Sequence, residues 1–172
     1  SSPSPPPRSA RPPPTVTCMF VHLHARSWYS FRAAGSSPEA LVAEAARLGM
    51  PVMGITDRHG AYGVVRFQQA CKEHGIRHVF GAEVPIRWAP ESQGNPTALA
   101  GPPTPGPHAL TGDLVLLARS RKGYANLCRL ITNAHLAAGE RDDRNHPWTT
   151  FEDLAAHSAD LICLTGSDEG LL

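Results

Sequence analysis

The chain contains 172 residues, a length typical of one domain, and 41% of them are hydrophobic, which is enough for a buried core. Charged residues make up 18% and the formal net charge is +1, so the composition excludes a strongly basic surface for nucleic acid. The four cysteines form no CxxC pair, which argues against a zinc ribbon.

The sequence also bears on the cellular compartment. No apolar stretch is long enough to span a membrane, and the N-terminus lacks the apolar centre of a signal peptide. Reduced thiols are the default for such a chain. We therefore expect a cytoplasmic protein with no membrane partner.

One proline-rich segment precedes the predicted domain, and a second interrupts it. Residues 1–16 are expected to form a disordered tail, because seven prolines leave little to bury. A Pro/Gly-rich segment at about 85–112 is predicted to be a surface insertion, since regular patterns resume after it. Residues 17–172 are thus predicted to form a single domain.

The first strands and helix can be placed by their hydrophobic pattern and by the residues typical of helix ends. A β-rich run predicts a strand at 16–23, and an apolar run predicts another at 51–56. Between them lies a predicted helix at 36–50, with Ser37 as N-cap, Pro38 in the first turn and Gly49 after its end. Its expected buried stripe consists of Leu41, Val42, Ala45 and Leu48.

The later elements alternate in the same way. Helices are predicted at 61–75, 121–137 and 149–158, and strands at 77–84, 113–118 and 160–166. The first of these helices should bury Val64, Phe67 and Cys71, and the last should begin with Thr149 or Thr150 as its cap. This order of continuous apolar strands and helices predicts an α/β fold with a largely parallel sheet.

Polar side chains recur where the predicted strands end. They are His22 and His24, Asp57 and His59, Glu83, and residues 165–168. Because α/β folds place their chemistry at the carboxyl ends of strands, we expect a site there. Two histidines alone would more often be packed side chains than ligands.

Residues 22–84 resemble the PHP (polymerase and histidinol phosphatase) domain of the DNA polymerase III alpha family, and the similarity extends over residues 19–172. The motifs SFRAAGSSPEALVAEAARLG, AYGVVRF, VFGAE and AHLAAGE look most similar to the error-prone, damage-induced branch. The resemblance implies the N-terminal part of a distorted (β/α)₇ barrel. In complete members, strand-end histidines and carboxylates hold divalent metals that hydrolyse phosphoesters.

This sequence departs from that ligand set. Arg26 stands where the family has the second histidine of HxH, and Arg58 where it has the histidine after aspartate, with His59 displaced by one place. Asp113 replaces a further histidine, and Ala33 an acidic residue. The surviving or weak ligand positions are His22, His24, Asp57, His59, Glu83 and Asp113.

Charge favours an ion-pair site over a metal site. Two unit charges about 4 Å apart interact with an energy of roughly 4 kcal/mol at an effective dielectric near 20. The repulsion between one arginine and a divalent metal ion at that distance is about twice as large. We therefore expect Arg26 and Arg58 to pair with Glu83 or Asp57. No bound metal is expected, although zinc, manganese or magnesium would suit an intact site.

The resemblance implies part of a DNA-directed DNA polymerase acting in replication or translesion repair. The polymerase carboxylates that bind magnesium do not lie in these residues. Expected partners are the remainder of the polymerase chain, DNA through that remainder, a sliding clamp and damage-response proteins. The alternatives are a stand-alone metal-dependent phosphoesterase for nucleotides, pyrophosphate or histidinol phosphate, and a non-catalytic relic.

Overall fold

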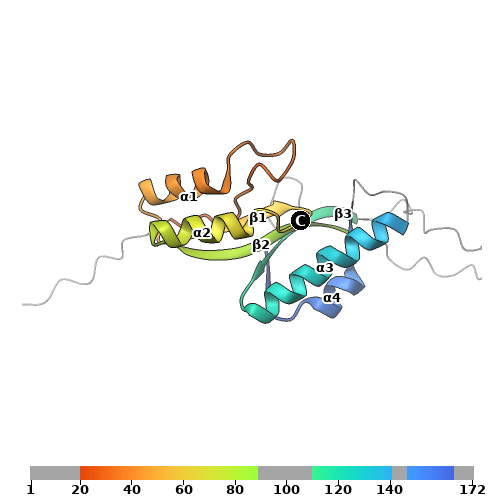
Figure 1. The fold of residues 1–172 in the computed structure, drawn as a ribbon. Helices are drawn as coiled ribbons and strands as arrows, with labels where there is room; N and C mark the ends of the chain where they lie inside the picture. The colour runs from red at the N-terminus through yellow and green to blue at the C-terminus, as the bar shows by residue number, and fades with distance from the viewer. Residues whose placement is uncertain (1–19, 89–109, 141–146, 165–172) are drawn as a thin grey trace, which may run out of the picture.

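The computed structural model describes residues 20–88, 110–140 and 147–164 (Figure 1). The predicted tail, most of the predicted insertion and residues 165–168 lie outside these ranges. The elements are α1 (Pro38–Arg47), β1 (Val52–Arg58), α2 (Val64–His74), β2 (Arg77–Trp88), β3 (Leu110–Ala118), α3 (Arg121–Glu140), β4 (Thr149–Thr150), α4 (Phe151–His157) and β5 (Leu161–Leu164).

Helices α1 and α4 begin at the N-cap residues predicted from the sequence. The Ser37 hydroxyl accepts a hydrogen bond from the Ala40 N–H at 3.1 Å, and the Thr150 hydroxyl accepts one from the Asp153 N–H at 3.1 Å. Both N-cap predictions are confirmed. Leu48, however, is 54% exposed and does not continue the buried stripe, because it is the C-cap residue of α1 and follows its last turn.

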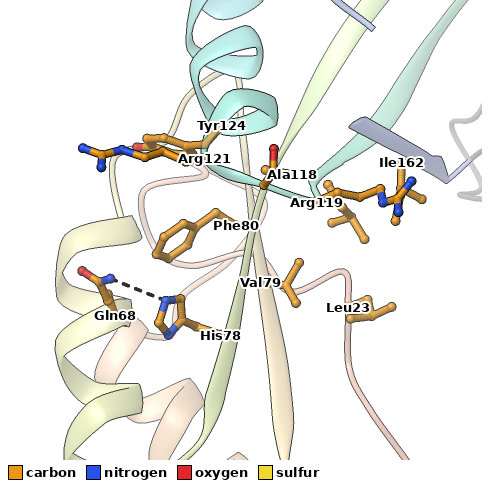
Figure 2. A pocket seen from close by; sticks show the side chains of 12 residues that line it. Leu23, Gln68, His78, Val79, Phe80, Ala118, Arg119, Arg121, Tyr124 and Ile162 are labelled. Carbon is orange, nitrogen blue, oxygen red and sulfur yellow. Dashed lines mark hydrogen bonds between the residues drawn. The ribbon is translucent and has the colours of Figure 1, made fainter. Parts of the chain in front are cut away.

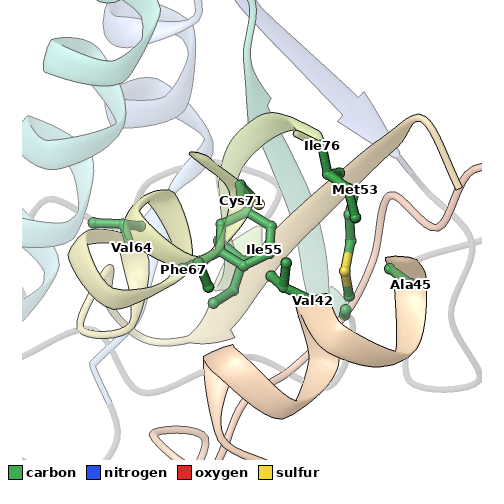
Figure 3. Packing of buried hydrophobic residues seen from close by; sticks show 10 residues of the cluster. Val42, Ala45, Met53, Ile55, Val64, Phe67, Cys71 and Ile76 are labelled. Carbon is green, nitrogen blue, oxygen red and sulfur yellow. The ribbon is translucent and has the colours of Figure 1, made fainter. Parts of the chain in front are cut away.

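Helix α2 packs into the hydrophobic cluster that it shares with α1 and β1. It ends before Gly75, which adopts the left-handed conformation (φ 68°) that favours glycine. Val64, Phe67 and Cys71 are buried as predicted, and Figure 3 shows them packed with residues of α1 and β1. The partners from those elements are Val42, Ala45, Met53 and Ile55.

The sheet is mixed rather than largely parallel, so that prediction was wrong. Its order is β1-β2-β3-β5; β1 pairs with β2 in parallel, whereas β2–β3 and β3–β5 are antiparallel, and the short β4 runs parallel to β2. A strand that is buried on both faces has the same apolar pattern whether it pairs in parallel or antiparallel with its neighbour. The apolar pattern therefore located the strands without giving their direction.

The strands also reach further than the pattern predicted. Residues 85–88 and 110–112, expected in the insertion, belong to the β2–β3 ladder, which extends to the pair Trp88–Leu110. Residues 22–25 run beside β1, with the Gly54 N–H bonded to the His22 carbonyl at 2.8 Å. In the described part they form only an isolated bridge instead of the predicted strand, and the sheet does not close into a barrel.

The two faces of the sheet have different roles. Buried residues of α1 and α2 pack on Met53 and Ile55 of β1, and those of α3 pack on Ala82, Val84 and Ile86 of β2. The parallel register pairs Ile55 with Phe80 and Asp57 with Ala82, so all of these side chains share one face, which the helices cover. Arg58 and Glu83, also paired in this register, therefore lie on the other face.

Within residues 20–88, 110–140 and 147–164, no helix is long and apolar enough to cross a membrane.

Candidate functional site

Glu83 lies at the centre of the candidate site. It is in the middle of β2 rather than at its end, and its side chain is fully buried. Arg26 binds one carboxylate oxygen twice, with its Nε 2.7 Å and its Nη2 2.6 Å from Oε2. The Nε2 of His24 lies 3.1 Å from the same oxygen. The segment that runs beside β1 is thus fastened to β2 through one acid.

Arg58 extends this group to a third strand. Its Nε lies 3.2 Å from Oε1 of Glu83, and its Nη2 donates a hydrogen bond of 2.5 Å to Oδ2 of Asp113. Asp113 pairs with Pro85 across the antiparallel β2–β3 ladder and so lies on the same face as Glu83. We call His24, Arg26, Arg58, Glu83 and Asp113 the charge cluster. It joins residues from β1, β2, β3 and the segment before them.

The charge cluster is buried at its acidic centre and partly open at its basic rim. The Glu83 side chain has no exposed area, whereas the side chains of His24, Arg26 and Arg58 are 27%, 25% and 35% exposed. Water can therefore reach part of each of these three side chains but none of the central carboxylate. The stability of the cluster depends mainly on the neutralisation of Glu83.

Asp57 is not a member of the charge cluster, which corrects its place among the candidate ligands. It is buried on the helix-covered face, where it accepts hydrogen bonds from the Ser27 N–H (2.7 Å), the Ser27 hydroxyl (2.9 Å) and the Ser30 hydroxyl (3.0 Å). Successive residues of a strand point to opposite faces, so Asp57 and Arg58 cannot both reach Glu83. Ser27 and Ser30 were not predicted from the sequence as partners of Asp57, although a buried carboxylate requires hydrogen-bond donors of this kind.

The other two candidate histidines, His22 and His59, take part in hydrogen bonds with backbone groups. His22 bonds through Nε2 to the His24 carbonyl at 2.9 Å. His59 has a positive φ of 60°, its N–H donates to the Glu83 carbonyl at 2.9 Å, and its carbonyl accepts from His135 Nε2 at 2.8 Å. These bonds hold the turn after β1 against β2 and α3.

The neighbouring cations set the ionisation of Glu83. Burial opposes the charged carboxylate, but the hydrogen bonds from His24 and Arg26 and the charge of Arg26 outweigh it and lower the pKa of Glu83 from 4.5 to about 2. The pKa of Asp113 is shifted in the opposite direction. Burial, together with its contact with Glu83, raises the pKa of Asp113 above 3.8, against the attraction of Arg58.

Acid should therefore weaken the fold through Glu83. Because the folded-state pKa of Glu83 is the lower one, its contribution is complete above pH 4.5 and is lost as the pH falls towards 2. It amounts to roughly 3 kcal/mol of unfolding free energy. The raised pKa of Asp113 has the opposite sign: it stabilises the fold below pH 3.8, and that part is lost as the pH rises through the raised pKa.

Carbon-13 NMR of the carboxyl groups, combined with urea unfolding at several pH values, measures both effects. We expect one glutamate carboxyl to remain ionised to about pH 2. Titration of every glutamate near its ordinary pKa would contradict the charge cluster described above.

The residues present do not fit a divalent metal. Guanidinium groups occupy both oxygens of Glu83, and Asp57 is committed to serine donors on the opposite face. Among the described residues, no group of three or more His, Cys, Asp and Glu side chains is arranged to hold a metal ion. Arg26 and Arg58 lie where a metal would meet repulsion from two positive charges.

The fold and site define an α/β protein whose sheet carries helices on one face and a polar, ionisable cluster on the other. Residues 22–172 match the model of the PHP domain, and the chain belongs to this family. The family resemblance seen in the sequence motifs is therefore confirmed.

The relatives include error-prone DNA polymerases. The chain is 41% identical over 136 residues to the enzyme of Mycobacterium tuberculosis, an alignment that covers 79% of this chain and 11% of the polymerase. For the enzyme of Nocardia farcinica the identity is 39% over 160 residues, with 76% and 14% covered. The chain therefore spans only a small part of the length of the relatives it matches.

A solved structure also resembles the fold. An amidohydrolase from Chromobacterium violaceum, with bound sulfate and no metal, aligns with a TM-score of 0.48 and 21% identity, covering 70% of this chain and 35% of its own.

Proposed function

We propose that this chain is the PHP-domain portion of an error-prone, DNA polymerase III alpha-type polymerase that acts in replication or translesion repair. The observation that carries this proposal is the 41% identity to the Mycobacterium tuberculosis error-prone DNA polymerase across 79% of the chain. DNA synthesis would belong to the remainder of such a polymerase, which would supply its own magnesium site.

Within that polymerase, the role proposed for this portion is structural rather than hydrolytic. The charge cluster ties together the segment of His24 and Arg26, β1 through Arg58, β2 through Glu83 and β3 through Asp113. In family members with an intact site, metal ligands occupy these strand positions. Here ion pairs would replace the metal as the link between the strands.

Partners and cofactors follow from the same proposal. The sheet would dock against the remainder of the polymerase chain, and DNA would be bound through that remainder. A sliding clamp and damage-response proteins would act on the whole polymerase in the cytoplasm. No metal cofactor is proposed for the charge cluster.

A chimera tests the proposal. The matching segment of the Mycobacterium tuberculosis error-prone DNA polymerase is replaced by residues 20–172, and primer extension is measured. We expect synthesis within about tenfold of the parent enzyme, roughly a 1.4 kcal/mol change in activation free energy. A soluble chimera without synthesis would contradict the polymerase assignment.

The phosphoesterase alternative has its own assay. The 172-residue chain is incubated with p-nitrophenyl phosphate, with and without Mn²⁺ or Zn²⁺. We expect no metal-dependent hydrolysis, because cations surround Glu83. Hydrolysis that Mn²⁺ stimulates and His24→Ala abolishes would overturn the structural role.

A further inference from the structure

A cavity lies at the end of the sheet where β2 begins, and its lining reaches both faces of the sheet but includes no residue of the charge cluster. Its volume is about 650 Å³, within the range of small-molecule sites. It opens where β2 begins and β3 ends, between α2 and the first turn of α3. Figure 2 shows its two sides, separated by the start of β2.

Aromatic rings line one of these sides. His78 and Phe80 alternate with Val79 along β2 and so point to the same face, where their rings stack with centroids 4.8 Å apart and planes at 29°. Tyr124 of α3 continues this row, with its ring centroid 5.6 Å from that of Phe80. All three residues are only half-buried. The ring faces that meet within the row are covered, and the parts of the three rings that remain exposed form one aromatic surface that a planar ligand can contact.

Polar groups stand at both ends of the aromatic row. Gln68 of α2 reaches His78 only at 3.5 Å, and its amide carries both donors and an acceptor. At the other end lies Arg121, beside Tyr124 (Figure 2). In the described part of the chain, no ion pair joins Arg121 or its neighbour Arg119 to a carboxylate. Asp160 accepts a hydrogen bond from the hydroxyl of Ser120, which lies between these two arginines in the sequence, at 3.0 Å.

We infer that this cavity binds a nucleotide. The base would stack on the row formed by His78, Phe80 and Tyr124, with the Gln68 amide at its edge, and the phosphate would lie near Arg121. An apolar floor with a cation at one end and an amide at the other matches a planar group that carries an anion. The ligand is either a free nucleotide or one nucleotide of a single DNA strand.

The test compares the parts of the ligand on the 172-residue chain. Amide NMR shifts are followed during titration with deoxyadenosine monophosphate, deoxyadenosine and inorganic phosphate. We expect the monophosphate to shift residues 78–80 and 121–124, and each part alone to bind at least about fivefold more weakly. The absence of a saturable shift up to about 10 mM monophosphate would overturn the inference.

Substitutions then separate the two contacts. Arg121→Gln should weaken binding of the monophosphate about fivefold or more and leave deoxyadenosine unchanged. Arg129→Gln is the matched control, because Arg129 is exposed on the same helix and does not line the cavity. An equal loss with Arg129→Gln would show general attraction to the basic helix and would contradict a site at Arg121.

Tyr124→Leu should weaken both the monophosphate and deoxyadenosine, since it shortens the aromatic row. The melting temperature shows whether each variant is folded, and Arg121→Gln replaces an exposed side chain, so it keeps the test valid if Tyr124→Leu does not fold.

An octanucleotide of deoxyadenosine distinguishes the two sources of ligand. Tighter binding by the octanucleotide, with an affinity that falls steeply with salt, assigns the cavity to a DNA strand. Tighter binding by the monophosphate assigns it to a free nucleotide. Shifts that map to Arg26 and Glu83 instead would place the ligand at the charge cluster and refute the inference.

Discussion

Replacing Glu83 by glutamine should cost about 3 kcal/mol of unfolding free energy, the lower end of the range for breaking a buried ion pair. The variant keeps the shape of the side chain but removes the charge that neutralises Arg26 and Arg58. The lower end applies because these two guanidinium groups are 25% and 35% exposed and remain partly solvated. Urea unfolding followed by circular dichroism measures the change.

The matched control for this substitution is Glu44→Gln on α1. Glu44 pairs with Arg47 at 2.6 Å, but both side chains are more than half exposed, so the loss should stay below about 0.5 kcal/mol. If Glu83→Gln costs no more than this control, the charge cluster does not stabilise the fold. Should the single variant not fold, the double variant with Arg26→Gln should recover part of the loss, because it no longer leaves that charge unpaired.

Combining Arg26→His with Arg58→His should create a metal site that the starting protein lacks. The change removes two cations, each worth roughly 8 kcal/mol of repulsion against a divalent ion at 4 Å and an effective dielectric near 20. It also places two imidazoles beside His24 and Glu83, a ligand set suited to zinc. We expect zinc affinity to rise at least about a hundredfold, as measured by competition titration.

Two further variants control this experiment. Arg47→His with Arg66→His adds the same two histidines at exposed ion pairs and should not raise zinc affinity. Adding His24→Ala to the new site should remove most of the gain. Stoichiometric zinc or manganese retained by the starting protein after dialysis, and lost on His24→Ala, would refute the ion-pair cluster.

Much of the local structure was predictable from single segments. The N-cap bonds of Ser37 and Thr150 and the end of α2 before Gly75 follow from side-chain and backbone preferences that act within one turn. The burial of Val64, Phe67 and Cys71 follows from helical periodicity in the same way. The Pro/Gly-rich composition predicted an insertion at about 85–112 but did not give the residues at which β2 ends and β3 begins.

The sequence by itself determined the family, the approximate positions of the helices and of most strands, and the presence of two arginines among the expected metal ligands. Only the tertiary structure decided the direction of β3 and which residues meet. Antiparallel pairing brings Asp113 to the face of Glu83, and the alternation of β1 sends Asp57 to Ser27 on the other face. Burial patterns are the same for either strand direction, whereas contacts between distant residues depend on register and direction together.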